Sequence, residues 1–451
     1  MWRSNTRRLL LLAAFLDASG QLAILMIVML TPFLTGLPVI GLTLNGQHLW
    51  LIGSMLLYLS LGWLFGSYTV LRWRRLPSIL LLQRVLLTSL ITVLVLAVCR
   101  WILNPDEEIW LVYRRVQLVW MPLLTLWSLL VRVGLRRGLL LPAVPELLFL
   151  GSESESETVM RAWQAVPTWK PLHVVSWSEL EQRLHDASDS LIVVTTVLQS
   201  LATDVGGALA KIEEQDPRRL ELVSPLRLFE LQQERLPPGL VPNPWLNYSE
   251  IPWLTQFSVQ AQLKRAADLL FATLLLLATS PILLIAALLI WVQDRGPVFY
   301  VQTRSGWLGQ PYRVFKLRTM TVAPWNAPAQ WTAKGDSRIT PIGLWLRKFR
   351  VDELPQLWNV LTGKMSLIGP RPERPEHEHA LEAQIPHYRK RHWMRPGLSG
   401  WAQVCSPYAS SVKDAELKLS YDLYYIKHFS TGLDLLILVK TIKTVLKAGG
   451  R

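Results

Sequence analysis

Two adjacent acids, Asp352 and Glu353, are the residues whose types and spacing point most directly to chemistry. They lie between two stretches with helical apolar spacing, 342–349 and 355–361, and a proline opens the second stretch, as it often does in a first helical turn. Positive partial charge at a helix N-terminus favours an ionised carboxylate, which is the form that a nucleophile needs. The nearest cations act in the same direction: Lys348 and Arg350. A capping Asp followed by a first-turn Glu is the alternative, and the local pattern alone favours it.

Three more cations in the same part of the chain favour the chemical interpretation. The alternating segment 314–320 predicts a strand with Lys316 and Arg318 on one face, where two cations can hold a phosphate. Arg371 lies between two prolines in the segment 369–372, and a fixed guanidinium suits bidentate phosphate binding. Each feature has an ordinary alternative, which is a solvated strand face or a surface turn. Together with the acid pair, these cations indicate phosphoryl chemistry.

The N-terminal part of the chain, residues 1–140, predicts a transmembrane region of four helices. Each of its four apolar segments is near the ~20 residues that a helix needs to cross a bilayer: 9–30, 49–65, 79–98 and 109–131. Arginines cluster after the second and fourth segments, so the positive-inside rule places both ends of the region in the cytosol, although Arg114 and Arg115 weaken the assignment of the fourth. Asp17 lies inside the first segment, where an acid can mark function, make a packing contact within the bundle or lie near the membrane interface.

A fifth apolar run, 269–292, decides on which side of the membrane the C-terminal part lies. It is long enough to cross a bilayer, but Ser280 and Pro281 lie at its centre and basic residues flank it on both sides. A proline removes a backbone donor and clashes with the preceding turn, so we expect a bend there. A re-entrant helix over about 264–292 would enter the membrane, bend and return, which keeps both flanks in the cytosol.

Residues 141–250 predict a soluble α/β domain and a proline-rich linker. Segments 146–151 and 191–196 resemble strands, and 178–185 resembles a helix. No glycine-rich fingerprint follows the first strand, and the acids within 152–155 would repel a phosphate. We therefore predict a degenerate Rossmann-like domain that serves assembly or regulation rather than cofactor binding.

From about residue 260 to the C-terminus, the chain resembles the bacterial sugar transferases, which are monotopic polyprenyl-phosphate hexose-1-phosphate transferases. The matching motifs are Gln302 to Gly309, Lys316 to Met320, Asp336 to Pro341, Asp352 to Val360, Met365 to Pro372, Arg395 to Val404 and Tyr421 to Tyr425. The four N-terminal helices and the central domain resemble the longer form of the family. The resemblance implies an α-rich catalytic domain over 251–451, with a re-entrant helix broken at Ser280 and Pro281.

The resemblance also implies a two-step transfer of hexose 1-phosphate from a UDP-sugar to polyprenyl (undecaprenyl) phosphate, with release of UMP. Asp352 matches the nucleophile that would form an aspartyl-phosphosugar, and Glu353 matches its partner acid. Glu353 would hold Mg²⁺ together with Asp352, or would assist the lipid phosphate; Mg²⁺ is an oxygen-binding cation that offsets the charge of a diphosphate. The implied substrate-binding residues are Lys316, Arg318 and Arg371, with Arg304, Arg338 and Arg395 as further candidates. Asp422 matches a recurrent acid whose role, catalytic or structural, stays open.

The implied location is the bacterial inner (plasma) membrane, with the catalytic domain facing the cytoplasm. The expected partners are the UDP-sugar, polyprenyl phosphate, membrane lipid and downstream glycosyltransferases that build exopolysaccharide, capsule or O-antigen. The sugar, the polymer and a homodimer stay open. Two rival functions also stay open: a nucleotide-sugar glycosyltransferase without phosphate transfer, and a non-enzymatic polysaccharide-assembly scaffold. The net charge of +14 would suit nucleic acid, but no motif that reads nucleic acid is present, and we expect no such partner.

Two other patterns near the C-terminus have structural interpretations. Segment 431–447 alternates apolar and basic faces, which suits either an anionic membrane surface or packing on its own domain. The acids and histidines of 376–379 predict a solvated loop rather than a metal site, because no ligand set with suitable spacing accompanies them.

Overall fold

The computed structural model of the chain describes residues 5–30, 47–68, 78–103, 113–137, 146–166, 171–186, 192–196, 203–215, 220–242, 258–321, 336–406 and 411–446. It divides into two compact units. One comprises Met1–Ser152 and Val166–Val223, and the other comprises Glu153–Ala165 and Ser224–Arg451.

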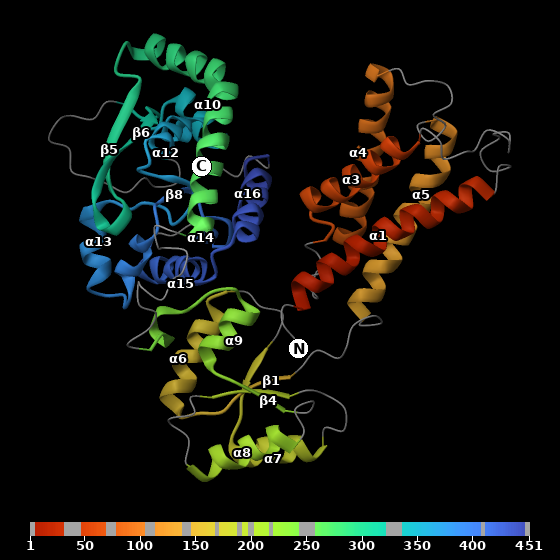
Figure 1. Cartoon of the computed structure of the whole chain (residues 1–451), viewed down its shortest axis with the longest axis vertical. Helices are drawn as coiled ribbons and strands as arrows, with labels where there is room; N and C mark the ends of the chain where they lie inside the picture. The colour runs from red at the N-terminus through yellow and green to blue at the C-terminus, as the bar shows by residue number, and fades with distance from the viewer. Residues whose placement is uncertain are drawn as a thin grey trace. The chain divides into compact units, whose positions relative to one another are not determined.

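Four long apolar helices open the first unit (Figure 1): α1 (Asn5–Leu30), α3 (His48–Phe65), α4 (Ser78–Leu103) and α5 (Arg114–Arg137). The first three follow the predicted segments closely, whereas α5 begins after the predicted start and extends further. All four share one core, in which Trp120 of α5 is fully buried among residues such as Leu25, Tyr58 and Leu96. Each helix is long and apolar enough to cross a membrane.

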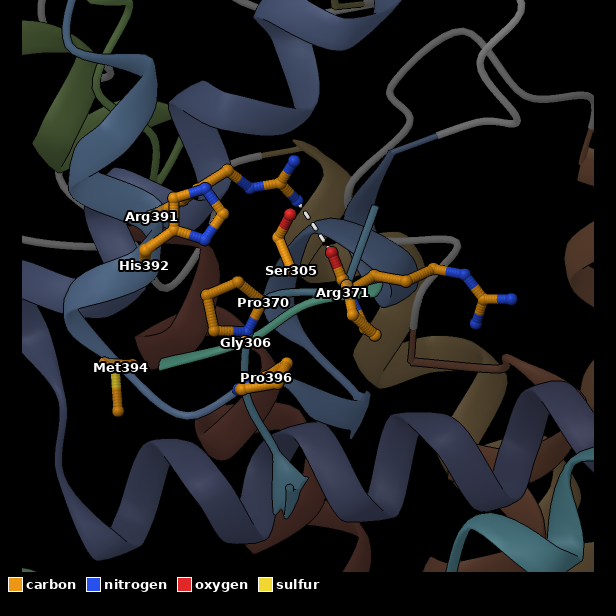
Figure 2. A pocket seen from close by; sticks show the side chains of 9 residues that line it. Ser305, Gly306, Pro370, Arg371, Arg391, His392, Met394 and Pro396 are labelled. Carbon is orange, nitrogen blue, oxygen red and sulfur yellow. Dashed lines mark hydrogen bonds between the residues drawn. The ribbon is translucent and has the colours of Figure 1, made fainter. Parts of the chain in front are cut away.

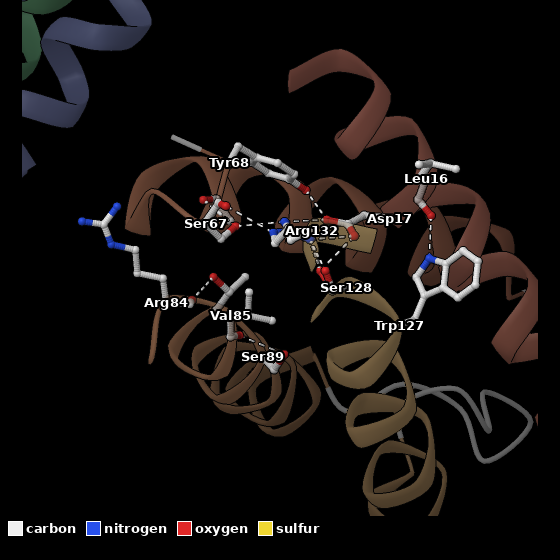
Figure 3. Close-up of polar contacts among 12 residues, drawn as sticks. Leu16, Asp17, Ser67, Tyr68, Arg84, Val85, Ser89, Trp127, Ser128 and Arg132 are labelled. Carbon is white, nitrogen blue, oxygen red and sulfur yellow. Dashed lines mark hydrogen bonds and ion pairs between the residues drawn. The ribbon is translucent and has the colours of Figure 1, made fainter. Parts of the chain in front are cut away.

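A buried ion pair joins the first and last of these helices (Figure 3). Arg132 makes a two-pronged contact with Asp17, with Nη1–Oδ1 and Nη2–Oδ2 distances of 3.0 and 2.8 Å. Tyr68 and Ser128 each donate a hydroxyl to the same carboxylate at 2.8 Å. Asp17 and Arg132 are at most 1% exposed. Asp17 therefore makes a packing contact between α1 and α5, one of the interpretations that the sequence allowed.

A parallel four-stranded sheet follows in the first unit. Its strands are β1 (Glu146–Phe149), β2 (Leu172–Val174), β3 (Ile192–Thr195) and β4 (Leu220–Val223), in the spatial order β2-β1-β3-β4. Helices α7 (Trp177–Asp186) and α8 (Thr203–Gln215) lie together beside it (Figure 1) and bury residues such as Leu180 and Leu209 against the strands. The two predicted strands and the predicted helix 178–185 are thus confirmed.

The predicted proline-rich linker is partly a packed element of the second unit. After α6 (Glu153–Gln164) and α9 (Pro225–Gln232), the short 3₁₀-helix η4 (Pro238–Leu240) lies against α15 (Val412–His428). The Leu236 amide donates to Ser420 at 2.8 Å, and Leu236 is fully buried. Within the described part of this segment, residues 237–242, the chain is folded onto its neighbours rather than extended between domains.

The longest helix, α10 (Val259–Asp294), has 36 residues and would measure about 54 Å if straight. Figure 1 shows it with a pronounced bend, and Pro281 lies inside it. Its first half packs through Ala272 against a core that includes Leu357, and its second half packs through Ile290 against Leu317 and Leu346. Both halves of α10 therefore pack against the same domain, although only 11% of the helix is buried.

The rest of the second unit surrounds these contacts with short elements. In chain order they are β5 (Phe299–Ser305), η7 (Trp307–Gly309), β6 (Pro311–Leu317), α11 (Pro341–Lys348), η8 (Val351–Gln356), α12 (Leu357–Leu361), β7 (Ser366–Ile368), α13 (Pro375–Glu382), η9 (Tyr388–Trp393), β8 (Gly397–Ser399), α14 (Trp401–Cys405), α15 and α16 (Thr431–Leu446). Strands β5 and β6 pair antiparallel, and β7 pairs parallel with β8.

Three predictions for this unit need correction or refinement. The expected loop 376–379 lies in helix α13, where Glu378 is buried beside His392. The expected helix 355–361 starts earlier, as the 3₁₀-helix η8, and becomes α-helical only at Leu357. The C-terminal amphipathic segment forms α16, which buries Leu433 and Ile437 and leaves Leu435 exposed, so packing on its own domain accounts for its inner face.

Candidate active site

The acid pair lies in the first turn of η8, beside strand β6. Arg350 precedes it with a left-handed backbone (φ 56°), a conformation that non-glycine residues rarely adopt and that often marks a functional turn. Asn359 of α12 fixes this region to the strand, because its amide donates to the Arg313 carbonyl at 2.8 Å and its oxygen accepts from the Phe315 amide at 3.3 Å. The acids are therefore held next to the side chains that β6 presents.

Glu353 is surrounded by cations. Its Oε1 lies 2.9 Å from Lys316 Nζ and 2.7 Å from Arg371 Nη2, and its Oε2 lies 3.4 Å from Arg350 Nη1. Burial raises the pKa of Glu353, but the positive charges of Arg371 and Lys316 outweigh burial and hold the pKa well below its ordinary value. Glu353 is thus a fully ionised and fully paired carboxylate.

Asp352 differs sharply from its neighbour. It is 9% exposed, and within the described ranges its carboxylate has no hydrogen bond or ion pair. Burial and the negative charge of Glu353 raise the pKa of Asp352 to about 6. At neutral pH Asp352 is therefore mostly ionised but poorly solvated and unpaired, which suits a nucleophile.

The structure brings two of the predicted substrate-binding cations, Lys316 and Arg371, to the acid pair. Arg318 instead forms an ion pair with Asp294 at the end of α10. Asp294, which follows the apolar part of α10, supplies a competing carboxylate that strand alternation does not reveal. Arg350, which the sequence assigned only an electrostatic influence, is a direct partner of Glu353.

The remaining predicted cations have other partners. Arg304 donates to the Pro372 carbonyl at 3.2 Å, and Arg338 pairs with Asp336 at 2.6 Å. Arg395 lies over the Trp307 ring, 5.4 Å from its centroid. Lys348 lies 5.5 Å from the centroid of the Trp345 ring. None of these four contacts involves the acid pair.

A small cavity lies behind Arg371 (Figure 2). Its lining includes Ser305, Gly306, Pro370, Arg371, Arg391 and His392. The Arg371 side chain points away from this cavity, while Arg391 donates to the Arg371 carbonyl at 2.9 Å. Asp422 lies behind Arg391, with Oδ2 3.1 Å from Nη2, and is 1% exposed. No sequence pattern pointed to Arg391, which stands in a basic run that resembles a solvated surface.

Asp352 and Glu353 are the side chains of this site that could contribute oxygen ligands to a magnesium ion bound together with substrate. Within the described ranges, no group of three or more His, Cys, Asp or Glu residues could hold a metal ion. Mg²⁺ commonly uses only one or two carboxylates and completes its coordination with phosphate oxygens and water. Asp352 and Glu353 supply that number, although the partners of Glu353 compete for its oxygens.

The C-terminal part of the chain is similar to known proteins. The family model for the bacterial sugar transferases matches residues 259–448. The chain is 42% identical over 212 residues to the UDP-N-acetylgalactosamine-undecaprenyl-phosphate N-acetylgalactosaminephosphotransferase of Aeromonas hydrophila, covering 47% of this chain and 50% of that protein. It is 40% identical over 185 residues to the UDP-glucose:undecaprenyl-phosphate glucose-1-phosphate transferase of Caulobacter vibrioides, covering 41% and 69%.

A third relative, the exopolysaccharide production protein PSS of Rhizobium leguminosarum bv. phaseoli, is 40% identical over 200 residues, which cover 42% of this chain and 96% of that protein. The chain spans half or less of some longer relatives, such as 50% of the Aeromonas protein and 40% of an Escherichia coli glucose-1-phosphate transferase. Since nearly the whole of the shorter Rhizobium protein is matched at this identity, the chain belongs to the bacterial sugar transferase family.

Proposed function

We propose that this protein transfers a hexose 1-phosphate from a UDP-sugar to polyprenyl (undecaprenyl) phosphate and releases UMP. The observation that carries the proposal is the unequal acid pair: Asp352 is desolvated and unpaired, while the adjacent Glu353 is held by Lys316, Arg350 and Arg371. The Aeromonas and Caulobacter relatives, whose names give undecaprenyl phosphate as a substrate, support the same reaction class.

In the first proposed step, an Asp352 carboxylate oxygen attacks the β-phosphorus of the UDP-sugar. A bond forms between that oxygen and the β-phosphorus, and the phosphoanhydride bond to the bridging oxygen breaks. UMP leaves with the bridging oxygen, and the sugar phosphate stays on Asp352 as an acyl phosphate. Lys316 and Arg371 contact the adjacent Glu353. From there they would stabilise the negative charge that develops on the phosphate oxygens in the transition state.

In the second step, a phosphate oxygen of polyprenyl phosphate attacks the same phosphorus. The bond to Asp352 breaks, which regenerates the carboxylate and yields a polyprenyl diphosphosugar. Asp352 and Glu353 would hold Mg²⁺, which would offset the negative charge of the diphosphate when bound. Downstream glycosyltransferases would then extend the sugar into exopolysaccharide, capsule or O-antigen.

We also propose that α10 is a re-entrant membrane helix and that the catalytic domain faces the cytoplasm of a bacterial inner membrane. The packing of both halves of α10 on one domain supports this topology, as do its exposed apolar side chains, such as Leu277 and Leu284. A helix that crossed the membrane once would carry one half away from that domain. The four N-terminal helices would span the membrane, and the parallel sheet would belong to a Rossmann-like domain for assembly or regulation.

Cysteine accessibility tests the topology. Gln262→Cys and Gln293→Cys, both at exposed positions outside the central apolar stretch, would be introduced singly after replacing Cys99 and Cys405. Both should resist a membrane-impermeant thiol reagent in sealed cells and react after permeabilisation. Labelling of position 293 alone in sealed cells would contradict the re-entrant geometry.

The released nucleotide tests the reaction. Purified protein with polyprenyl phosphate and a panel of UDP-sugars should release UMP with at least one donor, and Asp352→Asn should not. Release of UDP would instead favour a glycosyltransferase without phosphate transfer. Polymer synthesis that survives Asp352→Asn in cells would favour a non-enzymatic scaffold.

A further inference from the structure

We infer that Arg391 and Asp422 form a positioning pair that holds the main chain of Arg371, so that the Arg371 guanidinium meets the acid pair. The inference rests on the proposed function, because it assigns Arg371 a part in the transfer. It also gives Asp422 a role at a distance from the reacting atoms.

The loop around Arg371 has few ways to be anchored. Pro370 and Pro372 have no backbone N–H, so the carbonyl oxygens are the main groups through which the protein can hold this segment. All three carbonyls accept a hydrogen bond. The Gly397 amide donates to Pro370 at 2.9 Å, Arg391 Nη2 donates to Arg371 at 2.9 Å, and Arg304 Nη1 donates to Pro372 at 3.2 Å.

The hydrogen bond to the Arg371 carbonyl comes from a buried charged side chain, that of Arg391. Arg391 is 6% exposed, and its Nη1 donates to the Tyr388 hydroxyl at 2.6 Å while its Nη2 is shared between the Arg371 carbonyl and Asp422. A carboxylate and a guanidinium buried together are expensive to desolvate, and hydrogen bonds to further groups are needed to offset that cost. Here those further groups include the main chain of the loop that carries Arg371.

The positions of Arg391 and Asp422 indicate that neither residue contacts the substrate directly. Asp422 is 1% exposed, so it has almost no surface on which a substrate could bind. Figure 2 shows the Arg371 side chain extending away from Arg391, on the opposite side of the loop. Loss of Arg391 would therefore leave Arg371 present but free to move away from Glu353, its partner at 2.7 Å. Small misplacement of a clamping residue can reduce a rate by on the order of 100-fold.

Double-mutant analysis distinguishes positioning from simple destabilisation. Arg391→Gln and the milder Asp422→Asn would each be made alone and together with Arg371→Ala in the full chain, and UMP release would be measured. Arg391→Gln should lower kcat/KM by about 10- to 100-fold, mainly through kcat, but by less than about twofold in the Arg371→Ala background. Asp422→Asn should show the same pattern with a smaller loss.

Arg235→Gln is the matched control, because Arg235 is also a buried arginine that donates to a main-chain carbonyl, that of Ala162. If Arg235→Gln lowers kcat/KM only by destabilising the fold, it should do so by the same factor with and without Arg371→Ala. If Arg391→Gln and Asp422→Asn also act by equal factors in both backgrounds while the parent protein releases UMP, the positioning role is wrong and the proposed reaction stands. If the parent protein releases no UMP with any donor, the proposed function fails, and the inference fails with it.

Discussion

Replacing Asp352 by Asn should abolish transfer and yet stabilise the folded protein. The pKa of Asp352 is about 6 in the folded chain, against 3.8 for an unperturbed aspartate. One pKa unit corresponds to about 1.4 kcal/mol, so the ionised carboxylate lowers the free energy of unfolding by up to about 3 kcal/mol at neutral pH. Because Glu353 is coupled to it, we expect about 1–3 kcal/mol of stabilisation from the substitution, or a rise in Tm of about 3–10 °C.

The stabilisation by Asp352→Asn should depend on pH, because it reflects the cost of the ionised carboxylate. Above pH 6 the carboxylate is ionised in both the folded and unfolded chains, and the penalty is fully present. As the pH falls through 6, the folded chain takes up a proton before the unfolded chain does, so stability rises and the penalty disappears near pH 4. The advantage of Asp352→Asn at pH 7.5 should therefore shrink to about one third at pH 4.5.

Thermal unfolding of the detergent-solubilised parent and variant at both pH values provides the assay. Asp336→Asn is the control, because its pKa shift has the opposite sign: Arg338 lowers the pKa of Asp336 to about 2. Replacing the Asp336 carboxylate should therefore bring no stabilisation. Comparing variant with parent at each pH also cancels the contribution of Asp422, whose pKa burial raises to about 6. An Asp352→Asn protein that is no more stable than the parent at pH 7.5 would refute the claim that the Asp352 carboxylate is unpaired and desolvated in the folded chain.

Three other predictions follow from the same contacts. The acidic limb of kcat/KM should lie near pH 6 and move upward in Lys316→Met, because the charge of Lys316 lowers the pKa of Asp352; an unmoved limb would assign it to another group. Arg132→Met should cost about 3–5 kcal/mol in thermal assays, and Asp17→Leu added to it should restore part of the loss, whereas additive losses would contradict a coupled ion pair. Arg350→Gly should be about 1 kcal/mol more stable than Arg350→Ala, because only alanine keeps a Cβ at positive φ; equal stabilities would contradict that backbone.

The sequence singled out side chains that the structure places together, because the signals concerned are local, whereas their roles in substrate binding and catalysis stay predictions. Adjacent acids must lie together whatever the fold, and Lys316, singled out by strand alternation as a phosphate ligand, lies beside them. Arg371, singled out by its bracketing prolines, also contacts Glu353. The long apolar segments predicted the helices for a similar reason, since length and hydropathy depend little on tertiary contacts.

The predictions that needed correction depend on where an element ends or on contacts distant in sequence. Arg318 pairs with Asp294 of α10, a partner that strand alternation cannot reveal, and the helix expected over 355–361 begins earlier, as η8. Arg391 reaches Arg371 through a main-chain carbonyl, a contact that leaves no pattern in residue types. Glu378 was expected in a solvated loop because its neighbours are polar, but tertiary packing buries it in α13.

The most direct test of the account is to trap the covalent intermediate. The full chain would be incubated with a UDP-sugar labelled at the β-phosphorus, without polyprenyl phosphate, quenched and mapped by peptide mass spectrometry. We predict a phosphosugar adduct on Asp352 that disappears when polyprenyl phosphate is added and never forms in Asp352→Asn. An adduct on a different side chain, or rapid UMP release with no adduct at all, would contradict the central role of Asp352.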